Sequence, residues 1–210
     1  MPLPLPMPLT VTLTRSPTRV QTAARVALAA LSASLAVAAA PAARAADAPD
    51  GWALLKSPPA VVLFRHAEAP GVGDPPAFRL GDCGTQRNLD DRGRAQARRL
   101  GERFRAEGIA VGRVLTSQWC RTRETAELAF PGRPADAPAF NSFFGEAARR
   151  SPQTEAALAA VRAWRGPGVL VVVTHQVNIT ALTDVVPASG EGVVVRPAGD
   201  ALEVVARVRP

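Results

Sequence analysis

Residues 60–66 read AVVLFRH, five apolar residues that lead directly into Arg65 and His66. Residues 169–175 read VLVVVTH, a second apolar run that ends in His175, and these two histidines are the only ones in the 210-residue chain. Continuous apolar runs are typical of central parallel strands, which are buried on both faces. Because ligands bind at the carboxyl ends of strands in open α/β sheets, the two runs predict imidazoles that share one pocket if the strands are neighbours.

Predicted helices alternate with predicted strands along the rest of the chain. A helix is expected from Asp90 to about Gly108, because apolar residues recur there at positions i, i+3, i+4 and i+7. This alternation predicts an α/β fold, a three-layer α/β/α sandwich with a mostly parallel central sheet, in one domain over residues 59–210. The other predicted elements are strands at 111–116, 192–195 and 202–208, and helices at 117–130, 151–164 and 176–184.

The N-terminal segment has the composition of an export signal. Arg15, Arg19 and Arg25 precede an apolar run over residues 26–40, and residues 43–45 read ARA, the small-x-small pattern of a cleavage site. We therefore predict a signal peptide over residues 1–45, a flexible leader over 46–58, and a periplasmic or secreted mature protein. The apolar run is shorter than the ~20 residues of a membrane-spanning helix, so no span is expected after cleavage. A buried alanine-rich helix and an uncleaved anchor are the alternatives.

The charge of the chain favours a small anionic substrate. The formal net charge is +7, but the segment predicted to be removed contains four arginines, which leaves 21 basic against 18 acidic residues. This mild positive excess is not large enough to indicate a nucleic-acid partner. Arginines are frequent between residues 92 and 105, yet no aromatic or motif signature of nucleic-acid binding accompanies them, so we interpret them as a solvated helix face.

The two cysteines, Cys83 and Cys120, allow two interpretations. In an oxidising compartment, an even pair of cysteines is a candidate disulfide. Two free, buried thiols are the alternative, because spacing alone does not fix the geometry of a bridge. Neither cysteine lies in a CxxC motif, so we predict no metal site.

Two arginines are expected to join the histidines. Arg121 lies one turn into the helix that follows the strand at 111–116, and Arg65 directly precedes His66. A helix N-terminus adds backbone N–H donors at the same edge of the sheet. Since guanidinium groups bind phosphate oxygens in a bidentate manner, the sequence predicts a pocket for a tetrahedral dianion.

Four motifs resemble those of the histidine phosphatase superfamily, in its phosphoglycerate-mutase-like branch. They occur in the family's order over residues 61–183, and among the subgroups they are most similar to exported members resembling the lipopolysaccharide core heptose phosphatase. The motifs are Arg65-His66-Ala67-Glu68, in which alanine replaces the usual glycine of RHG; Leu89-x-x-x-Gly93-x-x-Gln96-Ala97; Ser117-x-x-x-Arg121-Thr122-x-Glu124-Thr125-Ala126; and Thr174-His175 with Asn178.

The resemblance implies a phosphoglycerate-mutase-like fold and a metal-independent phosphatase without a cofactor. His66 would attack phosphorus and carry a transient phosphoryl group, while Arg65, Arg121 and His175 would bind the phosphate oxygens. The substrate would be a phosphorylated small molecule or glycan. Further substrate-binding candidates are Arg87, Asn88, Asn178 and Ser117.

The general acid is the open point of this assignment. Relatives commonly supply a glutamate some twenty residues beyond the arginine, where this chain has Ser142. Glu146, Glu68 and Asp82 are the candidate proton donors. The substitution motivates a second hypothesis, a catalytically degenerate protein that binds a phosphate ligand. A phosphoglycerate mutase ranks third, because export would separate it from glycolysis and the donor glutamate is missing.

We expect the exported protein to begin at Ala46, because signal peptidase cleaves after the small-x-small pattern. N-terminal sequencing of the protein recovered from the periplasm or the medium checks this expectation. A mature product that begins at Met1 would contradict it.

Overall fold

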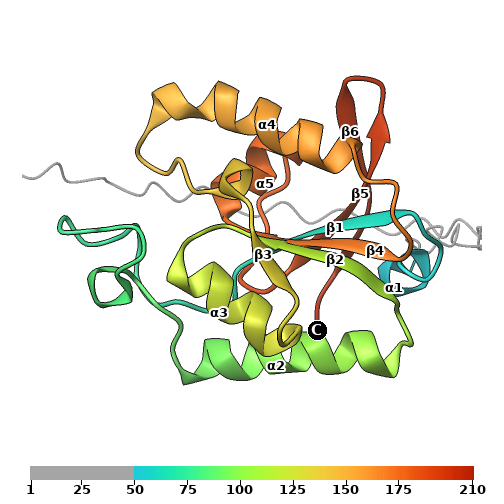
Figure 1. The fold of residues 1–210 in the computed structure, drawn as a ribbon, viewed down its shortest axis with the longest axis horizontal. Coiled ribbons are helices and arrows are strands. Elements are labelled where there is room, and N and C mark those ends of the chain that lie inside the picture. Colours follow the sequence, from blue (N-terminus) through green and yellow to red (C-terminus); the bar gives the residue numbers. More distant parts are fainter. Residues whose placement is uncertain (1–49) are drawn as a thin grey trace, which may run out of the picture. The chain divides into compact units, whose positions relative to one another are not determined.

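The computed structural model describes residues 50–210, and the central sheet with its covering helices is shown in Figure 1. The predicted signal peptide over residues 1–45 and the first part of the predicted leader lie outside the described residues. Among residues 50–210, no helix combines the length and the apolar character needed to cross a membrane.

A six-stranded sheet forms the centre of the fold, in the order β3-β2-β4-β1-β5-β6. The first four strands of this order run parallel to one another. Beyond them, β5 is antiparallel to β1, and β6 is antiparallel to β5. The three-layer α/β class with a mostly parallel sheet is thus confirmed. The strands are β1 (Ala60–Arg65), β2 (Val111–Thr116), β3 (Pro134–Asp136), β4 (Val169–Thr174), β5 (Gly192–Ala198) and β6 (Ala201–Val208).

Helices cover both faces of the sheet, which explains why β1 and β4 are apolar in every residue but the last, Arg65 in β1 and Thr174 in β4. In Figure 1, α2 (Asp91–Ala106) and α3 (Cys120–Ala129) lie on one face, and α4 (Arg150–Arg162) and α5 (Gln176–Thr183) lie on the other. Three short 3₁₀ turns occupy the loops: η1 (Cys83–Thr85), η2 (Pro138–Phe140) and η3 (Ala147–Arg149).

Each face of the sheet has its own apolar core. Leu100 and Phe104 of α2 pack with Val171 of β4 in one cluster, in agreement with the predicted apolar face of this helix. Val161 of α4 and Ile179 of α5 belong to the second cluster, on the other face. Because successive side chains of a strand point to opposite faces of the sheet, the buried strands contribute residues to both clusters.

Two elements differ from the sequence-based expectation. The sequence does not predict β3, which pairs with β2 at the edge of the sheet, where its proline costs no ladder hydrogen bond. We expected residues 46–58 to form a flexible leader, but Gly51–Leu54 form the helix α1. Trp52 and Leu55 are buried, and the Trp52 ring lies edge-on to Phe104 at 5.6 Å, so burial of these side chains orders the segment.

Cys83 and Cys120 form a disulfide, with an S–S distance of 2.01 Å and 5.7 Å between the Cα atoms. The bond joins the long loop between β1 and α2 to the first residue of α3. With a sequence separation of 37 between the partners, a bond of this kind typically stabilises the folded state by about 3–4 kcal/mol. It holds the loop against the helix that carries Arg121.

Candidate active site

The pairing of β1 with β4 brings the two histidines together. Arg65 lies opposite Thr174 in the parallel register, and the His66 N–H donates to the Thr174 carbonyl at 2.9 Å. His66 and His175 follow directly after these paired residues. Their ring centroids are 5.6 Å apart, with the ring planes at 67°. The two imidazoles therefore share one edge of the sheet.

The His66 ring is held in one tautomer. Its Nδ1 lies 2.7 Å from the Ala67 carbonyl oxygen, which can only accept a hydrogen bond. Nδ1 therefore carries the proton, and Nε2 keeps its lone pair. The Nε–H of Arg121 points at that lone pair from 3.3 Å. This is the tautomer that a nucleophilic imidazole needs.

The His175 ring has the opposite tautomer. Its Nδ1 faces the NH2 group of Arg121 at 3.5 Å, and a guanidinium can only donate, so the proton lies on Nε2. Nε2 is 2.8 Å from the Ser117 hydroxyl, which in turn lies 3.3 Å from Asn141 Oδ1. The predicted helix at 117–130 begins only at Cys120, as α3. Ser117, a predicted substrate-binding residue, is fully buried, and its hydroxyl orients His175 instead.

Arg121 connects the two imidazoles. Its side chain is buried, and its NH1 and NH2 groups donate to the two carboxylate oxygens of Asp74, at 2.7 and 3.2 Å. A guanidinium has a second edge, formed by Nε and NH2, and this edge faces His66 and His175. Asp74 therefore fixes the arginine through one edge and leaves the other for the oxygens of a bound anion.

Asp74 was missed by the sequence-based prediction. An aspartate between glycine and proline is typical of a turn, so nothing in its immediate sequence indicated a site. Besides Arg121, its carboxylate accepts hydrogen bonds from the Arg87 backbone N–H at 3.1 Å and from Trp119 Nε1 at 3.0 Å. With four donors around it, Asp74 acts as an acceptor and counter-ion.

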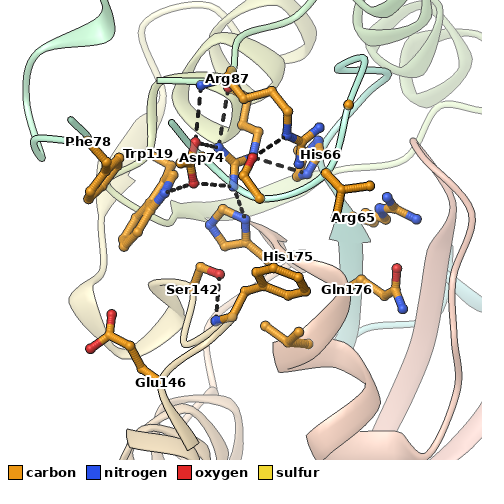
Figure 2. Close-up of a pocket in the computed structure, with 16 residues that line it drawn as sticks. Arg65, His66, Asp74, Phe78, Arg87, Trp119, Ser142, Glu146, His175 and Gln176 are labelled. Atoms are coloured by element: carbon orange, nitrogen blue, oxygen red, sulfur yellow. Dashed lines mark hydrogen bonds and ion pairs between the residues drawn. The ribbon is translucent and has the colours of Figure 1, made fainter. Parts of the chain in front are cut away.

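These side chains line one pocket of about 370 Å³ (Figure 2). Arg65 lines it as well: its NH1 donates to the Pro187 carbonyl at 3.0 Å, whereas its buried Nε has no partner among the described residues. A buried donor without an acceptor is costly, so this nitrogen lowers the stability of the folded state by a small amount. Among residues 50–210, no group of three or more His, Cys, Asp or Glu side chains could hold a metal ion.

Burial and positive charge keep both histidines neutral. Burial, together with the charge of Arg121, lowers the pKa of His66 to about 3. The same two causes hold the pKa of His175 well below its usual value. Burial alone would raise the pKa of Asp74, but its hydrogen bonds with Arg121 and the charge of this arginine outweigh burial and lower the pKa. At neutral pH the pocket therefore contains two neutral imidazoles and an ionised aspartate.

The Leu89-to-Ala97 motif holds the turn that follows His66. Gly93 lies so close to the Glu68 carbonyl that any β-carbon would collide with it. Gln96 accepts a hydrogen bond from the Glu68 N–H at 3.0 Å and donates to the Ser189 carbonyl at 2.7 Å. These contacts join the first turns of α2 to the backbone on both sides of the site.

Of the predicted substrate-binding residues, Arg87 lines the pocket, and its Nε also donates to the Gly73 carbonyl at 2.8 Å. Asn88 and Asn178 do not line it. The Asn88 amide donates to the Cys83 carbonyl at 2.7 Å, within the loop. The Asn178 amide donates to a backbone carbonyl at 2.8 Å and is buried. Both amides hold backbone segments in place.

Of the three candidate proton donors, only Glu146 lines the pocket, and its carboxylate pairs with Arg149 at 2.7 Å. Glu68 is exposed outside the pocket. Asp82 accepts a hydrogen bond from a backbone N–H of its own loop and also lies outside the pocket. Ser142, at the position where a glutamate was expected, is buried and lines the pocket.

We expect both imidazoles to stay neutral down to about pH 5, because burial lowers the pKa values of His66 and His175. Since the unfolded chain takes up these protons near pH 6.5, the free energy of unfolding should fall as the pH drops below that value. NMR of the imidazole protons checks this simply, since the chain has two histidines. Titration of either ring near pH 6.5 in the folded protein would contradict it.

Replacement of Asp74 by alanine should lower the free energy of unfolding by about 3 kcal/mol, because it leaves the buried Arg121 without its counter-ion. Inorganic phosphate should restore more stability in D74A than in the unmodified protein, since a dianion can replace the lost charge. Urea unfolding with and without phosphate measures both effects. The control is D91A, which removes an exposed partner of Arg94 and should change neither. Equal gains from phosphate in D74A and the unmodified protein would refute the role of Asp74.

Comparison with known proteins agrees with the geometry. Residues 61–138 match the model of the histidine phosphatase superfamily (branch 1). The chain is 37% identical over 75 residues to the mitochondrial serine/threonine-protein phosphatase Pgam5 of Drosophila virilis, a match that covers 36% of this chain and 23% of that relative. It therefore spans about a quarter of the length of this relative.

Two solved structures share the fold. One is a phosphoserine phosphatase of Entamoeba histolytica in complex with 3-phosphoglyceric acid, with a TM-score of 0.52 and 12% identity over 70% of this chain and 95% of that one. The other is the product of an open reading frame of Mycobacterium tuberculosis, with a TM-score of 0.51 and 15% identity over the same shares. The segment that carries His66 and Arg121 is thus similar to the histidine phosphatase superfamily (branch 1), and the chain shares the fold of these two structures.

Proposed function

We propose that this protein is an exported, metal-independent phosphatase that hydrolyses a phosphomonoester through a phosphohistidine on His66. The observation that carries the proposal is the tautomer of His66, which lines the pocket: the ring is neutral, its Nδ1–H is held by a backbone carbonyl, and its Nε2 keeps the lone pair that Arg121 contacts. The match of residues 61–138 to the histidine phosphatase superfamily supports it, and so does the positive charge of the surrounding side chains.

The proposed reaction has two steps. His66 Nε2 attacks phosphorus and forms the P–N bond while the bond to the ester oxygen breaks. Water then attacks the phosphohistidine, the P–N bond breaks, and inorganic phosphate and neutral His66 are regenerated. Nδ1 keeps its proton throughout, because the Ala67 carbonyl holds it, and this hydrogen bond stabilises the positive charge that develops on the ring.

Stabilisation of the transferring phosphoryl group falls to the residues around His66. Arg121 offers its Nε and NH2 edge, and Arg65 and Arg87 add positive charge as further residues that line the pocket. Electrostatic stabilisation of the equatorial oxygens is the main requirement of phosphoryl transfer. His175 adds a neutral ring whose Nδ1 accepts from Arg121, which helps to aim the guanidinium at the phosphate.

Export is supported by the basic and apolar N-terminal segment with its cleavage pattern, and by the disulfide between Cys83 and Cys120, a bond that persists mainly in oxidising compartments. An exported phosphatase would meet its substrate in the periplasm or the medium. The sugar phosphate of a lipopolysaccharide core, another sugar phosphate and a phosphoprotein are the substrate classes that the resemblance leaves open.

A degenerate phosphate-binding protein is the second candidate function, and Ser142 favours it. The Ser142 hydroxyl accepts a hydrogen bond from the Phe144 N–H at 3.2 Å and cannot replace a carboxylic acid as a proton donor. General acid catalysis contributes typically 10²–10⁴-fold, so its loss slows a phosphatase without abolishing the nucleophilic step. The two candidates differ in whether a covalent intermediate forms.

We expect H66A to lower kcat/KM for 4-nitrophenyl phosphate by more than about 10³-fold, because it removes the nucleophile. The activity of the unmodified protein should persist in EDTA, and acid quenching should trap a phosphohistidine that is absent in H66A. The matched control is R98A, on the exposed face of α2.

The outcomes separate the alternatives. Full activity in H66A would overturn the assigned nucleophile. Phosphate binding by calorimetry, without a trapped intermediate or turnover of any ester, would establish the degenerate binder. Interconversion of 2- and 3-phosphoglycerate would establish a mutase.

A further inference from the structure

The pocket has a charged inner end and an apolar outer end. His66, His175 and the arginines form the inner end, where the phosphoryl group binds in the proposed function. Towards solvent, apolar side chains from four separate segments line the pocket. They are Val72 and Phe78 of the loop after β1, Trp119 before α3, Phe144 of the loop after η2, and Val177 of α5.

One wall of the outer end is a fixed pair of aromatic rings. Trp119 and Phe78 are stacked, with ring centroids 5.1 Å apart and planes at 18°. The edge of Trp119 also meets the His175 ring at 5.3 Å, and its Nε1–H donates to Asp74. These contacts hold the indole in place, so the aromatic wall beside His175 is already formed before a ligand binds.

The opposite side of the mouth exposes apolar surface to solvent. The side chains of Val72 and Phe144 are 88% and 58% exposed, and both line this pocket. A β-carbon placed on Gly73 would lie 3.5 Å from the Phe144 ring, so the two loops approach each other at the mouth. Exposed apolar groups that gather at a cleft indicate an apolar binding partner.

Neither acidic side chain of the pocket is placed to protonate a leaving group at His66. Asp74 accepts four hydrogen bonds, and its lowered pKa keeps it ionised. Glu146 pairs with Arg149, and Figure 2 shows its carboxylate at the outer edge of the pocket, turned away from His66. Among the described residues that line the pocket, these two are the only carboxylates.

A leaving group that receives no proton from the protein must depart as an anion. A phenolic oxygen, with a pKa near 10, does this far more readily than an aliphatic alkoxide, whose conjugate acid is about as weak as water. A phenol also presents a flat apolar ring next to the phosphate. The apolar outer end and the missing proton donor thus point to the same chemical class.

We propose that the substrate is the phosphate monoester of a phenolic hydroxyl, with its ring between the Trp119–Phe78 wall and Phe144. This proposal rests on the proposed function and specifies its substrate. When His66 Nε2 bonds to phosphorus, the P–O bond breaks, the phenolate leaves with the electron pair, and it takes its proton from water. The source of the phenol is either a small aryl phosphate or a phosphotyrosyl peptide.

Three esters separate ring recognition from leaving-group reactivity. Phenyl phosphate has a ring and a phenolic oxygen, benzyl phosphate has a ring and an aliphatic oxygen, and a hexose 6-phosphate has neither ring nor phenol. We expect kcat/KM, which reports cleavage of the P–O bond, to be at least about 100-fold higher for phenyl phosphate than for benzyl phosphate, the lower range of what a general acid would supply. KM for the two ring esters should be similar and at least tenfold below KM for the hexose phosphate.

Matched variants test the position of the ring. V72S changes a valine that lines the pocket, and V186S makes the same change at an exposed valine outside it. We expect V72S and F144A to raise KM for phenyl phosphate severalfold with little change in kcat, and V186S to change neither. KM for the hexose phosphate should be the same in all of these variants.

The results distinguish failure of this proposal from failure of the proposed function. Equal kcat/KM for phenyl and benzyl phosphate, a preference for the hexose phosphate, or a selective loss of benzyl phosphate turnover in E146Q would overturn the phenolic substrate but leave a phosphatase. Absence of turnover and of phosphohistidine with every ester would overturn both. Comparison of phenyl phosphate with a phosphotyrosyl peptide then identifies the source, and faster turnover of either one agrees with phenolic chemistry.

Discussion

The site depends on how one buried guanidinium is held. Arg121 is the group that contacts both His66 and His175, and its orientation is set by the two-pronged ion pair with Asp74. A guanidinium is planar, so fixing one edge fixes the other. The carboxylate thereby directs two N–H groups at the space where a phosphoryl group would bind. It also balances one of the positive charges that burial would otherwise make costly.

The same positive charge determines the protonation state of the imidazoles. Arg65, Arg87 and Arg121 lie around the pocket, and with burial they make a charged histidine unfavourable. A neutral ring with a defined tautomer is the form that can attack phosphorus. In the proposed function, the arginines that would bind the phosphate therefore also keep His66 in the neutral form that can attack phosphorus.

The centre of the site could be predicted, whereas its periphery could not. His66 and His175 end apolar runs, and strands of this kind become neighbours in the middle of a parallel sheet. The position of Arg121 at the same edge of the sheet could be predicted because only a short connection separates its helix from the preceding strand. Asp74 reaches the site only because the long loop after β1 folds back towards α3, where the disulfide to Cys120 holds it and Trp119, just before α3, donates a hydrogen bond to Asp74. Asn88 was assigned to the pocket, but its amide holds the loop itself.

The sequence by itself determined the class of fold, the sheet edge that carries the site and the residues at its centre. Apolar periodicity and strand ends are local features, so they can be read in each segment of the sequence without knowing the others. Only the tertiary structure decided the tautomers of the two histidines, the counter-ion of Arg121 and the apolar mouth of the pocket. Each of these depends on contacts between residues far apart in the chain, such as Ser117 with His175 and Asp74 with Arg121, whose geometry is set by packing.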